Sequence, residues 1–152
     1  MPPLTEIDLA PAFVPRTATF LEAAEALVSS PVSTIAVLDD DEHVVGLFGD
    51  EALLSGLFPR YLAELHHTAF TADDSDMIDT RTREVASEPV KKHMAKPVVL
   101  DSSTSAIHCA QRFLHCDFGA LPVVEGGRFV GMLGRGEFCR AVLRKSLRDA
   151  DP

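Results

Sequence analysis

Residues 17–39 read TATFLEAAEALVSSPVSTIAVLD, and residues 103–125 read STSAIHCAQRFLHCDFGALPVVE. The two stretches align without a gap at an offset of 86 residues and carry apolar residues at matching positions. The match resumes at an offset of 85, where residues 44–53 face residues 129–138. A repeat of this length indicates two copies of one supersecondary unit.

Each copy is predicted to fold as strand, helix, strand, strand, helix. In the first copy apolar residues recur at helical spacing after Thr19, which favours a helix N-cap, and the run Asp101–Ser105 precedes the same pattern in the second copy. Residues 34–38 and 120–124 are short and apolar, as buried strands are. Glu125-Gly-Gly-Arg128 predicts a hairpin, because glycine supplies the positive φ that such turns need.

A second helix is predicted in each copy, at residues 50–57 and at 136 to about 147. One such unit cannot cover both faces of its own sheet, so we expect two units to pair and bury it. The expected division is a first repeat at 1–57, a connector at 58–92 and a second repeat at 93–152, forming one compact module.

The connector carries its own structural signals. A helix is predicted from Asp73–Asp76 to about Ala86, with acidic residues at its positive end. Residues 88–94 predict another helical turn with Pro89 at its first position. Residues 61–70 fit a helix and a strand equally well.

The second copy carries the most specific pattern. Ala120-Leu-Pro-Val-Val124 stands before the Gly-Gly turn, Val130-Gly-Met-Leu-Gly-Arg135 follows it, and residues 93–100 read HMAKPVVL. With its twofold β-α-β-β-α order, the chain resembles a tandem CBS (cystathionine-beta-synthase) domain pair, or Bateman module, over about residues 13–147. The resemblance implies an α/β fold of two repeats around a pseudo-twofold axis, and a homodimer. It also implies a cleft ligand such as AMP, ATP or another adenosine-containing molecule, with output through a partner protein.

The ligand signature of that family departs from its usual form here. It has a Ser or Thr hydroxyl and, three residues later, an Asp carboxylate for the ribose diol. The hydroxyl position holds Gly49 in the first copy and Gly134 in the second, and the carboxylate position holds Ala52 and Glu137. Because Ala52 cannot accept from a diol and Glu137 can, we expect a nucleotide in the Glu137 cleft alone.

The predicted ligand-binding residues follow from this choice of cleft. They are Val98, Val99, Leu100, Gly119, Ala120, Leu121, Gly134, Arg135 and Glu137. The loop Gly134-Arg135-Gly136 has two interpretations, an anion site made of backbone amides or a tight strand-to-helix turn.

Two His-Cys pairs, His108-Cys109 and His115-Cys116, lie seven residues apart on one predicted helix. Seven residues span about 10 Å of helix, so the two pairs cannot share one ion alone, and we expect no metal site. Cys109 is expected in the core opposite Ala23, with the histidines at solvent or a dimer surface, and Cys139 is expected in the core.

Composition limits the function classes. The 152 residues carry 14 basic and 23 acidic side chains, a net charge of −9 that opposes non-specific nucleic-acid binding. No apolar stretch is long enough for a membrane span, and we expect no signal peptide. Three cysteines, all in the second half, favour a reducing cytoplasm over a disulfide framework.

Two functional hypotheses remain open. The first is a stand-alone regulatory module that senses a small ligand, such as an adenine nucleotide, and acts through a partner protein. The alternative is a degenerate, ligand-independent homodimeric interaction module. No nucleophile, base and orienting residue stand together in a recognisable pattern, so we do not expect an enzyme.

Overall fold

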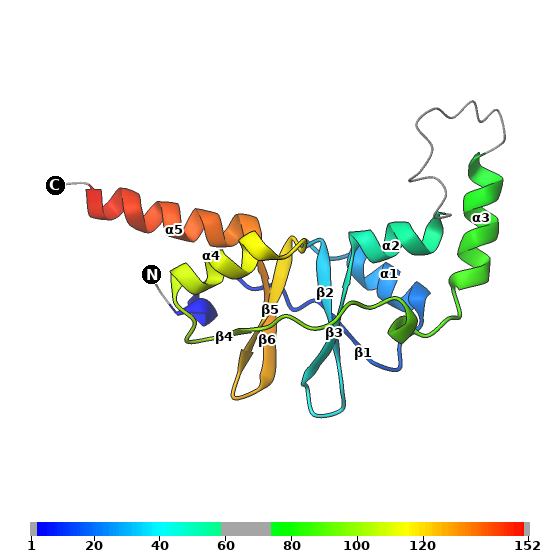
Figure 1. Ribbon diagram of the computed structural model, residues 1–152, viewed down its shortest axis with the longest axis horizontal. Coiled ribbons are helices and arrows are strands. Elements are labelled where there is room, and N and C mark those ends of the chain that lie inside the picture. Colours follow the sequence, from blue (N-terminus) through cyan, green and yellow to red (C-terminus); the bar gives the residue numbers. More distant parts are fainter. Residues whose placement is uncertain (1–2, 59–73, 151–152) are drawn as a thin grey trace.

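The computed structural model describes residues 3–58 and 74–150. Two repeats stand side by side, each with a three-stranded sheet and two helices (Figure 1). The first contains β1 (Phe13–Pro15), α1 (Phe20–Val28), β2 (Thr34–Leu38), β3 (Val44–Gly49) and α2 (Asp50–Leu57). The second contains β4 (Leu100–Asp101), α4 (Ala106–His115), β5 (Ala120–Glu125), β6 (Arg128–Gly134) and α5 (Arg135–Ala150). The predicted order of elements is confirmed.

The two sheets have the same topology. In each, the first strand pairs in parallel with the second, which pairs antiparallel with the third, giving the orders β1-β2-β3 and β4-β5-β6. The parallel pair needs a crossover connection, which α1 and α4 supply. The mixed α/β fold with two equivalent repeats is therefore confirmed.

Local sequence signals set the element ends. Thr19 Oγ1 accepts from the N–H of Glu22, and the Glu22 carboxylate accepts from the N–H of Thr19, a complete capping box. Ser105 Oγ accepts from the N–H of His108 in the same position of α4. Gly126 and Gly127 adopt φ values of 59° and 82°, so the predicted glycine hairpin is confirmed.

The apolar core consists of three clusters of buried side chains. One apolar cluster lies in each repeat, and a third contains residues of both sheets: Ala10, Ala36, Leu38, Ala120 and Met132. Ala36 on β2 and Ala120 on β5 are fully buried, and side chains this small let the two sheets approach closely. Pairing therefore buries sheet surface that a single repeat would expose, as expected.

Each repeat is completed by a segment from the other half of the chain. The short 3-10 turn η1 (Leu4–Glu6) packs on the second repeat, where the N–H of Leu4 donates to Ser102 O at 3.4 Å. The turn η3 (Val90–Lys92) packs on the first repeat, where the N–H of Val90 donates to Ala18 O at 2.9 Å. These two turns are exchanged between the repeats.

The connector helix α3 (Asp74–Val85) lies at one end of the module, beside α2 (Figure 1). Arg81 Nε donates to the carbonyl of Gly56 near the end of α2 at 2.8 Å. Val85 is fully buried with Phe20 in the first-repeat cluster. The predicted helix is confirmed, and no helix among the described residues is long and apolar enough to cross a membrane.

Several details differ from the expectations. Pro89 caps a 3-10 turn from outside, with an extended ψ of 139°, instead of occupying a first helical position. Helix α5 begins one residue earlier than predicted and runs on to Ala150, because nothing in its basic C-terminal half breaks a helix. Cys139 is exposed, not in the core, because Phe138 takes the inward position. The expectation for residues 61–70 lies outside the described residues.

Candidate functional site

The two strand-to-helix junctions are equivalent and are joined to each other. The N–H of Asp50, at the start of α2, donates to Ser33 O at 3.0 Å, and the N–H of Arg135, at the start of α5, donates to Gly119 O at 2.9 Å. Gly119 lies against Ser33, since a Cβ there would come within 2.3 Å of Ser33 Oγ. We name the whole chain of contacts, from the N–H of Asp50 through Ser33 and Gly119 to the N–H of Arg135, the junction bridge. Because it uses the N–H of Arg135, that amide is not available to an anion.

A cleft lies at each junction. We name the one beside Gly134 and Glu137 the second cleft, and it consists of two hollows of about 270 and 280 Å³. The first hollow is lined by Asp8, Leu9, Ala10, Pro11, Pro31, Val32, Met132, Gly134 and Glu137. The other is lined by Glu6, Ile7, Asp8, Glu137, Ala141, Arg144 and Arg148. Glu137 thus lines both hollows.

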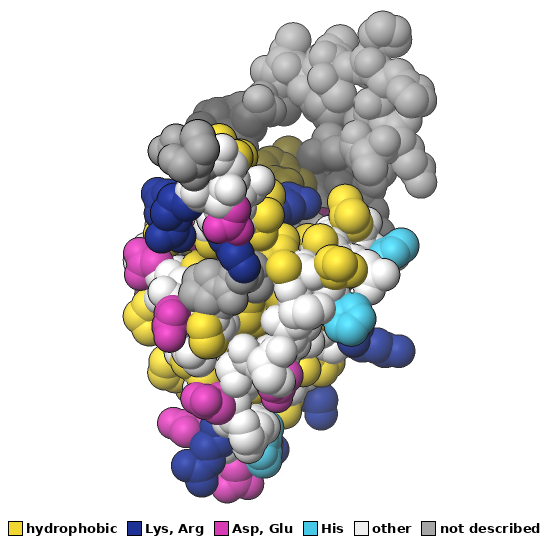
Figure 2. All heavy atoms as spheres, turned by 90° about the vertical axis from the view of Figure 1, so that its left-hand side faces the viewer, with side chains coloured by type: hydrophobic (Ala, Val, Ile, Leu, Met, Phe, Trp, Pro, Cys, Tyr) yellow, Lys and Arg dark blue, Asp and Glu magenta, His cyan; other side chains and the backbone are white. Residues whose placement is uncertain are grey.

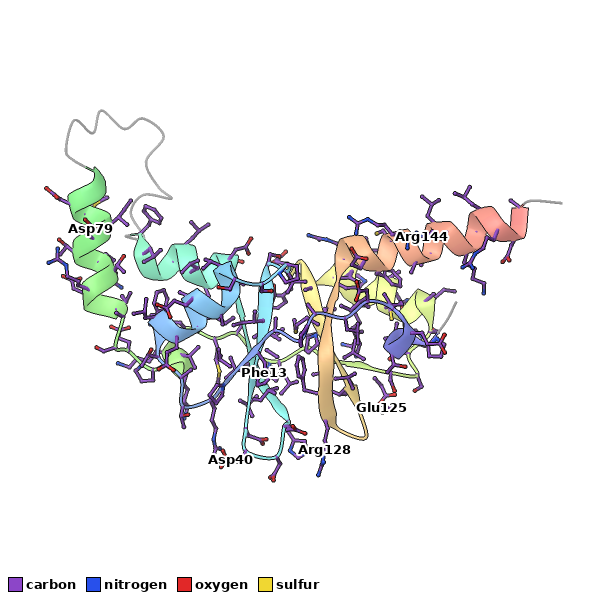
Figure 3. The ribbon with its side chains drawn as sticks, turned by 180° about the vertical axis from the view of Figure 1, so that it is seen from behind. Phe13, Asp40, Asp79, Glu125, Arg128 and Arg144 are labelled. Carbon is purple, nitrogen blue, oxygen red and sulfur yellow. The ribbon has the colours of Figure 1, made fainter. Side chains whose placement is uncertain are left out.

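The two hollows differ in chemistry. The first is mainly apolar, whereas the other brings Arg144 and Arg148 of α5 near three carboxylates, those of Glu6, Asp8 and Glu137. Figure 3 shows Arg144 on α5, at the end of the molecule opposite Asp79 on α3. The Glu137 carboxylate is half-exposed and forms an ion pair through Oε1 with the Arg140 guanidinium one turn along α5.

The first cleft, beside Gly49 and Ala52, is a wider groove of about 900 Å³. Its floor is closed by Leu47 and Ala95, which exchange backbone hydrogen bonds of 3.0 and 2.8 Å. Four carboxylates (Asp50, Glu51, Glu84 and Asp117) and two cations (Arg81 and Lys92) line it. Carboxylates therefore outnumber cations by two in this groove and by one in the arginine-bearing hollow of the second cleft.

The predicted ligand-binding residues do not all meet in one place. Gly134 and Glu137 line the second cleft together. Arg135 and Gly119 meet at the junction bridge, and Ala120 and Leu121 are fully buried in β5.

The remaining predicted residues lie elsewhere. Val98, Val99 and Leu100 line a separate groove between β4 and α4. The sequence reasoning missed residues 8–11, which line the second cleft in their place. A signal for this was present, because Pro3-Leu4 and Pro89-Val90 repeat at the same offset of 86 as the copies themselves.

One cysteine of the second repeat, Cys109, lies in the core. Cys109 is fully buried as expected, and burial raises the pKa of its thiol, as for an inert core cysteine.

Asp39, Asp41 and His43 place one ligand-type atom each within 4.8 Å of one another in the β2–β3 turn. Asp39 accepts from the N–H groups of His43 and Asp41, both at 2.9 Å, and that of His43 is the main cause that lowers the Asp39 pKa. The Asp39 carboxylate therefore stabilises the β2–β3 turn through these backbone hydrogen bonds.

Two equivalent repeats with a cleft at each strand-to-helix junction define a paired α/β module. A sequence model of the CBS domain matches residues 6–58 and again residues 90–144. The chain therefore belongs to the CBS domain family and contains a pair of CBS repeats.

Curated relatives come from Arabidopsis thaliana. The chain is 28% identical over 141 residues to the chloroplastic CBS domain-containing protein CBSX1, covering 86% of this chain and 58% of the relative. It is 28% identical over 137 residues to chloroplastic CBSX2, covering 81% of this chain and 55% of the relative. The chain thus spans little more than half the length of these two relatives.

Solved structures agree on the fold. The crystal structure of CBSX2 from Arabidopsis thaliana is 26% identical, with a TM-score of 0.68 over 96% of this chain and 92% of that one. CBSX2 in complex with AMP gives 26% and 0.62, over 96% and 94% of the two chains. The AMP-bound CBS domain protein PAE2072 from Pyrobaculum aerophilum gives 19% and 0.67, over 95% and 97%. At 19% identity the last of these supports the fold alone.

Proposed function

We propose that this chain is a regulatory module that binds an adenine nucleotide in the second cleft and acts through a partner protein. The observation that carries the proposal is the position of Glu137, which lines an apolar hollow on one side and an arginine-bearing hollow on the other. The AMP complex of CBSX2 supports the choice of ligand.

The two hollows suit the two ends of a nucleotide. Leu9 and Val32 offer apolar surface to an adenine ring. Arg144 and Arg148 offer guanidinium groups, which bind phosphate oxygens in pairs of hydrogen bonds. Between these ends lies the carboxylate of Glu137, which can accept hydrogen bonds from the ribose hydroxyls.

The ion pair of Glu137 leaves room for this contact. Among the described residues Arg140 contacts Oε1, and no residue donates to Oε2. A ribose hydroxyl can therefore bond to Oε2 while the ion pair persists. Arg140 also holds the longer Glu side chain near the helix, which offsets its extra methylene relative to Asp.

The acidic first cleft favours a different charge. Phosphate groups would meet Asp50, Glu51 and Asp117 there, and like charges repel at short range. We therefore propose that a dianionic nucleotide prefers the second cleft although the first is wider. A neutral or cationic adenosine ligand such as S-adenosylmethionine fits the first cleft better.

An apolar helical face supports the proposed homodimer. Leu21 and Val28 on α1 are exposed, and their counterparts Ile107 and Leu114 on α4 are exposed as well, Leu114 to 82%. Leu54 on α2 extends the same class of exposed side chain. Two copies that bring these faces together would remove the apolar side chains from water.

Calorimetry with AMP tests the nucleotide proposal. We expect one site per chain in the wild type, and Glu137→Ala should weaken binding about tenfold or more, since a hydrogen bond to a charged group is lost. Glu51→Ala, the matched loss of an acidic residue in the first cleft, should not weaken it. Arg144→Gln should reduce affinity for AMP but not for adenosine.

The opposite results would favour the alternatives. Loss of AMP binding through first-cleft substitutions, with Glu137→Ala unaffected, would move the ligand to the wide groove. No binding of AMP, ATP, adenosine or S-adenosylmethionine at millimolar ligand would leave the ligand-independent interaction module as the better account.

A further inference from the structure

A third groove, outside both clefts, lies between the edge strand β4 and helix α4 and has a volume of about 860 Å³. We name it the α4 groove. It is lined by Val98, Val99, Leu100, Asp101, Thr104, His108, Gln111, Arg112, His115, Cys116 and Val124. The histidines that stand out in the sequence therefore share one groove with the Val98–Leu100 segment.

Helical spacing explains why these side chains converge. His108, Arg112 and His115 lie four and three residues apart, so they project from one face of α4 across about 10 Å of helix. All three are exposed, whereas Cys109 and Phe113 occupy the buried face. The groove thus has one wall of N–H donors and, on the side of β4, an apolar wall.

The α4 groove differs in charge from the acidic chain around it, because its one guanidinium group, Arg112, faces only one carboxylate, Asp101. Helix α4 contains no Asp or Glu, while the chain as a whole has a net charge of −9. At the same offset of 86, the first repeat has Glu22 and Glu25 where the second has His108 and Gln111, and Ala26 at the position of Arg112. The same helical face therefore carries two carboxylates in the first repeat and one guanidinium group in the second.

One carboxylate lines the groove, and it already has partners. Asp101 Oδ1 accepts from the Ser103 hydroxyl at 2.6 Å and from the Ser103 N–H at 3.0 Å. Both bonds hold Oδ1 within its own turn, and among the described residues Asp101 forms no ion pair with Arg112. The guanidinium group is therefore available to an external anion.

We infer that the α4 groove is a second ligand site, which binds a phosphate ester with an apolar body. Arg112 would hold the phosphate through paired N–H donors, with His108, His115 and Gln111 donating around it. The apolar body would lie along Val98 and Val99, the valines of the groove lining that are not buried. The inference is independent of the nucleotide proposed for the second cleft, because the two sites share no residue.

Phenyl phosphate and inorganic pyrophosphate are the probes for this site. Proton NMR of the histidine rings during titration should shift the signals of His108 and His115, assigned with His108→Gln and His115→Gln. Arg112→Gln should weaken phenyl phosphate about tenfold or more, because a charge-assisted bond is removed. Arg112 is exposed, so an unchanged melting temperature should show that the variant folds.

A control makes the result decisive. Arg144→Gln, in the second cleft, should leave phenyl phosphate binding unchanged.

Three outcomes would overturn the inference. The first is binding that depends on Arg144 and not on Arg112, which would place the probe in the second cleft. The second is the absence of any shift of the two histidine signals at millimolar probe. The third is affinity that requires a divalent metal ion, which would make the groove a cation site.

Discussion

Leu4 and Val90 hold equivalent positions in opposite repeats: each follows a proline, begins a 3-10 turn and is fully buried. Leu4 packs in the cluster of the second repeat and Val90 in that of the first. Each repeat therefore depends on a segment that precedes the strands of the other repeat in the sequence.

Truncating Leu4 tests this exchange. Leu4→Ala should reduce the free energy of unfolding by about 2–5 kcal/mol, the usual cost of a large buried apolar truncation. Chemical denaturation monitored by circular dichroism measures the loss. Leu147→Ala, at an exposed leucine of α5, is the control and should change stability little. Equal stability of the two variants would show that η1 is dispensable.

Removal of one buried hydroxyl group, unlike truncation of Leu4, is expected not to destabilise the protein. Thr34 is 1% exposed, and its Oγ1 has no hydrogen-bond partner among the described residues. Its counterpart at offset 86 is Ala120, so the second repeat manages without a hydroxyl. Thr34→Val should keep or raise the melting temperature, with a gain of up to about 1 kcal/mol. Thr19→Val, which removes the bonded cap of α1, should instead cost about 1 kcal/mol. A large loss in Thr34→Val would reveal a hidden partner.

The signature glycine of the second cleft accepts a side chain. A Cβ on Gly134 would lie 3.6 Å from Val32 Cγ1 and 3.8 Å from Glu137 Cγ, both ordinary contacts, and its φ is not positive. Gly134→Thr should therefore fold normally and, together with Glu137→Asp, strengthen AMP binding about two- to tenfold by adding a neutral hydrogen bond. Calorimetry is the measurement. If AMP binds no better to this double variant, the cleft is adapted to another ligand.

Asp101 gives a pH-dependent prediction. The Ser103 hydroxyl, and after it the Ser103 N–H, lower the Asp101 pKa below its ordinary value of 3.8. Because the folded pKa is lower than the unfolded one, the stabilisation is present above pH 3.8 and is lost as the pH falls through the folded value. Asp101→Ala should thus lower the melting temperature at pH 7 and lose this effect in strong acid. A pH-independent difference would assign its role to packing.

Assembly can be tested on the apolar helical face. Ile107→Asp with Leu114→Asp should convert the proposed dimer to a monomer, because two charges would be buried without partners in the interface. Light scattering gives the mass at tens of micromolar protein. Val130→Asp changes an exposed apolar residue on β6, away from these helices, and should leave the mass unchanged. A wild-type monomer would reject the dimer.

Local features were predictable from the sequence and distant ones were not. The caps at Thr19 and Ser105 and the turn at Gly126-Gly127 depend on neighbouring backbone groups, which adjacent residues define. The exact end of α5 was not predictable, because neither glycine nor proline marks a boundary near residue 147, where the helix was expected to end.

The candidate site shows the same limit. Gly134 and Glu137 were placed together because they are three residues apart at one junction. Val98–Leu100 were assigned to the same cleft but line the α4 groove. The second cleft is instead lined by residues 8–11, which reach it through the exchange of η1 and η3, a long-range pairing that local patterns do not encode.

The junction bridge has a thermodynamic consequence. It runs from the start of α2 through Ser33 and Gly119 to the start of α5, so one end touches the first cleft and the other end the second. Residues 31 and 32 of the first repeat line the second cleft, and residues 117 and 118 of the second repeat line the first. A ligand that displaced one end of the bridge on binding would therefore change the free energy of binding at the other cleft. Such a linkage would be reciprocal, so ligands in the two clefts would change each other's affinity by the same factor.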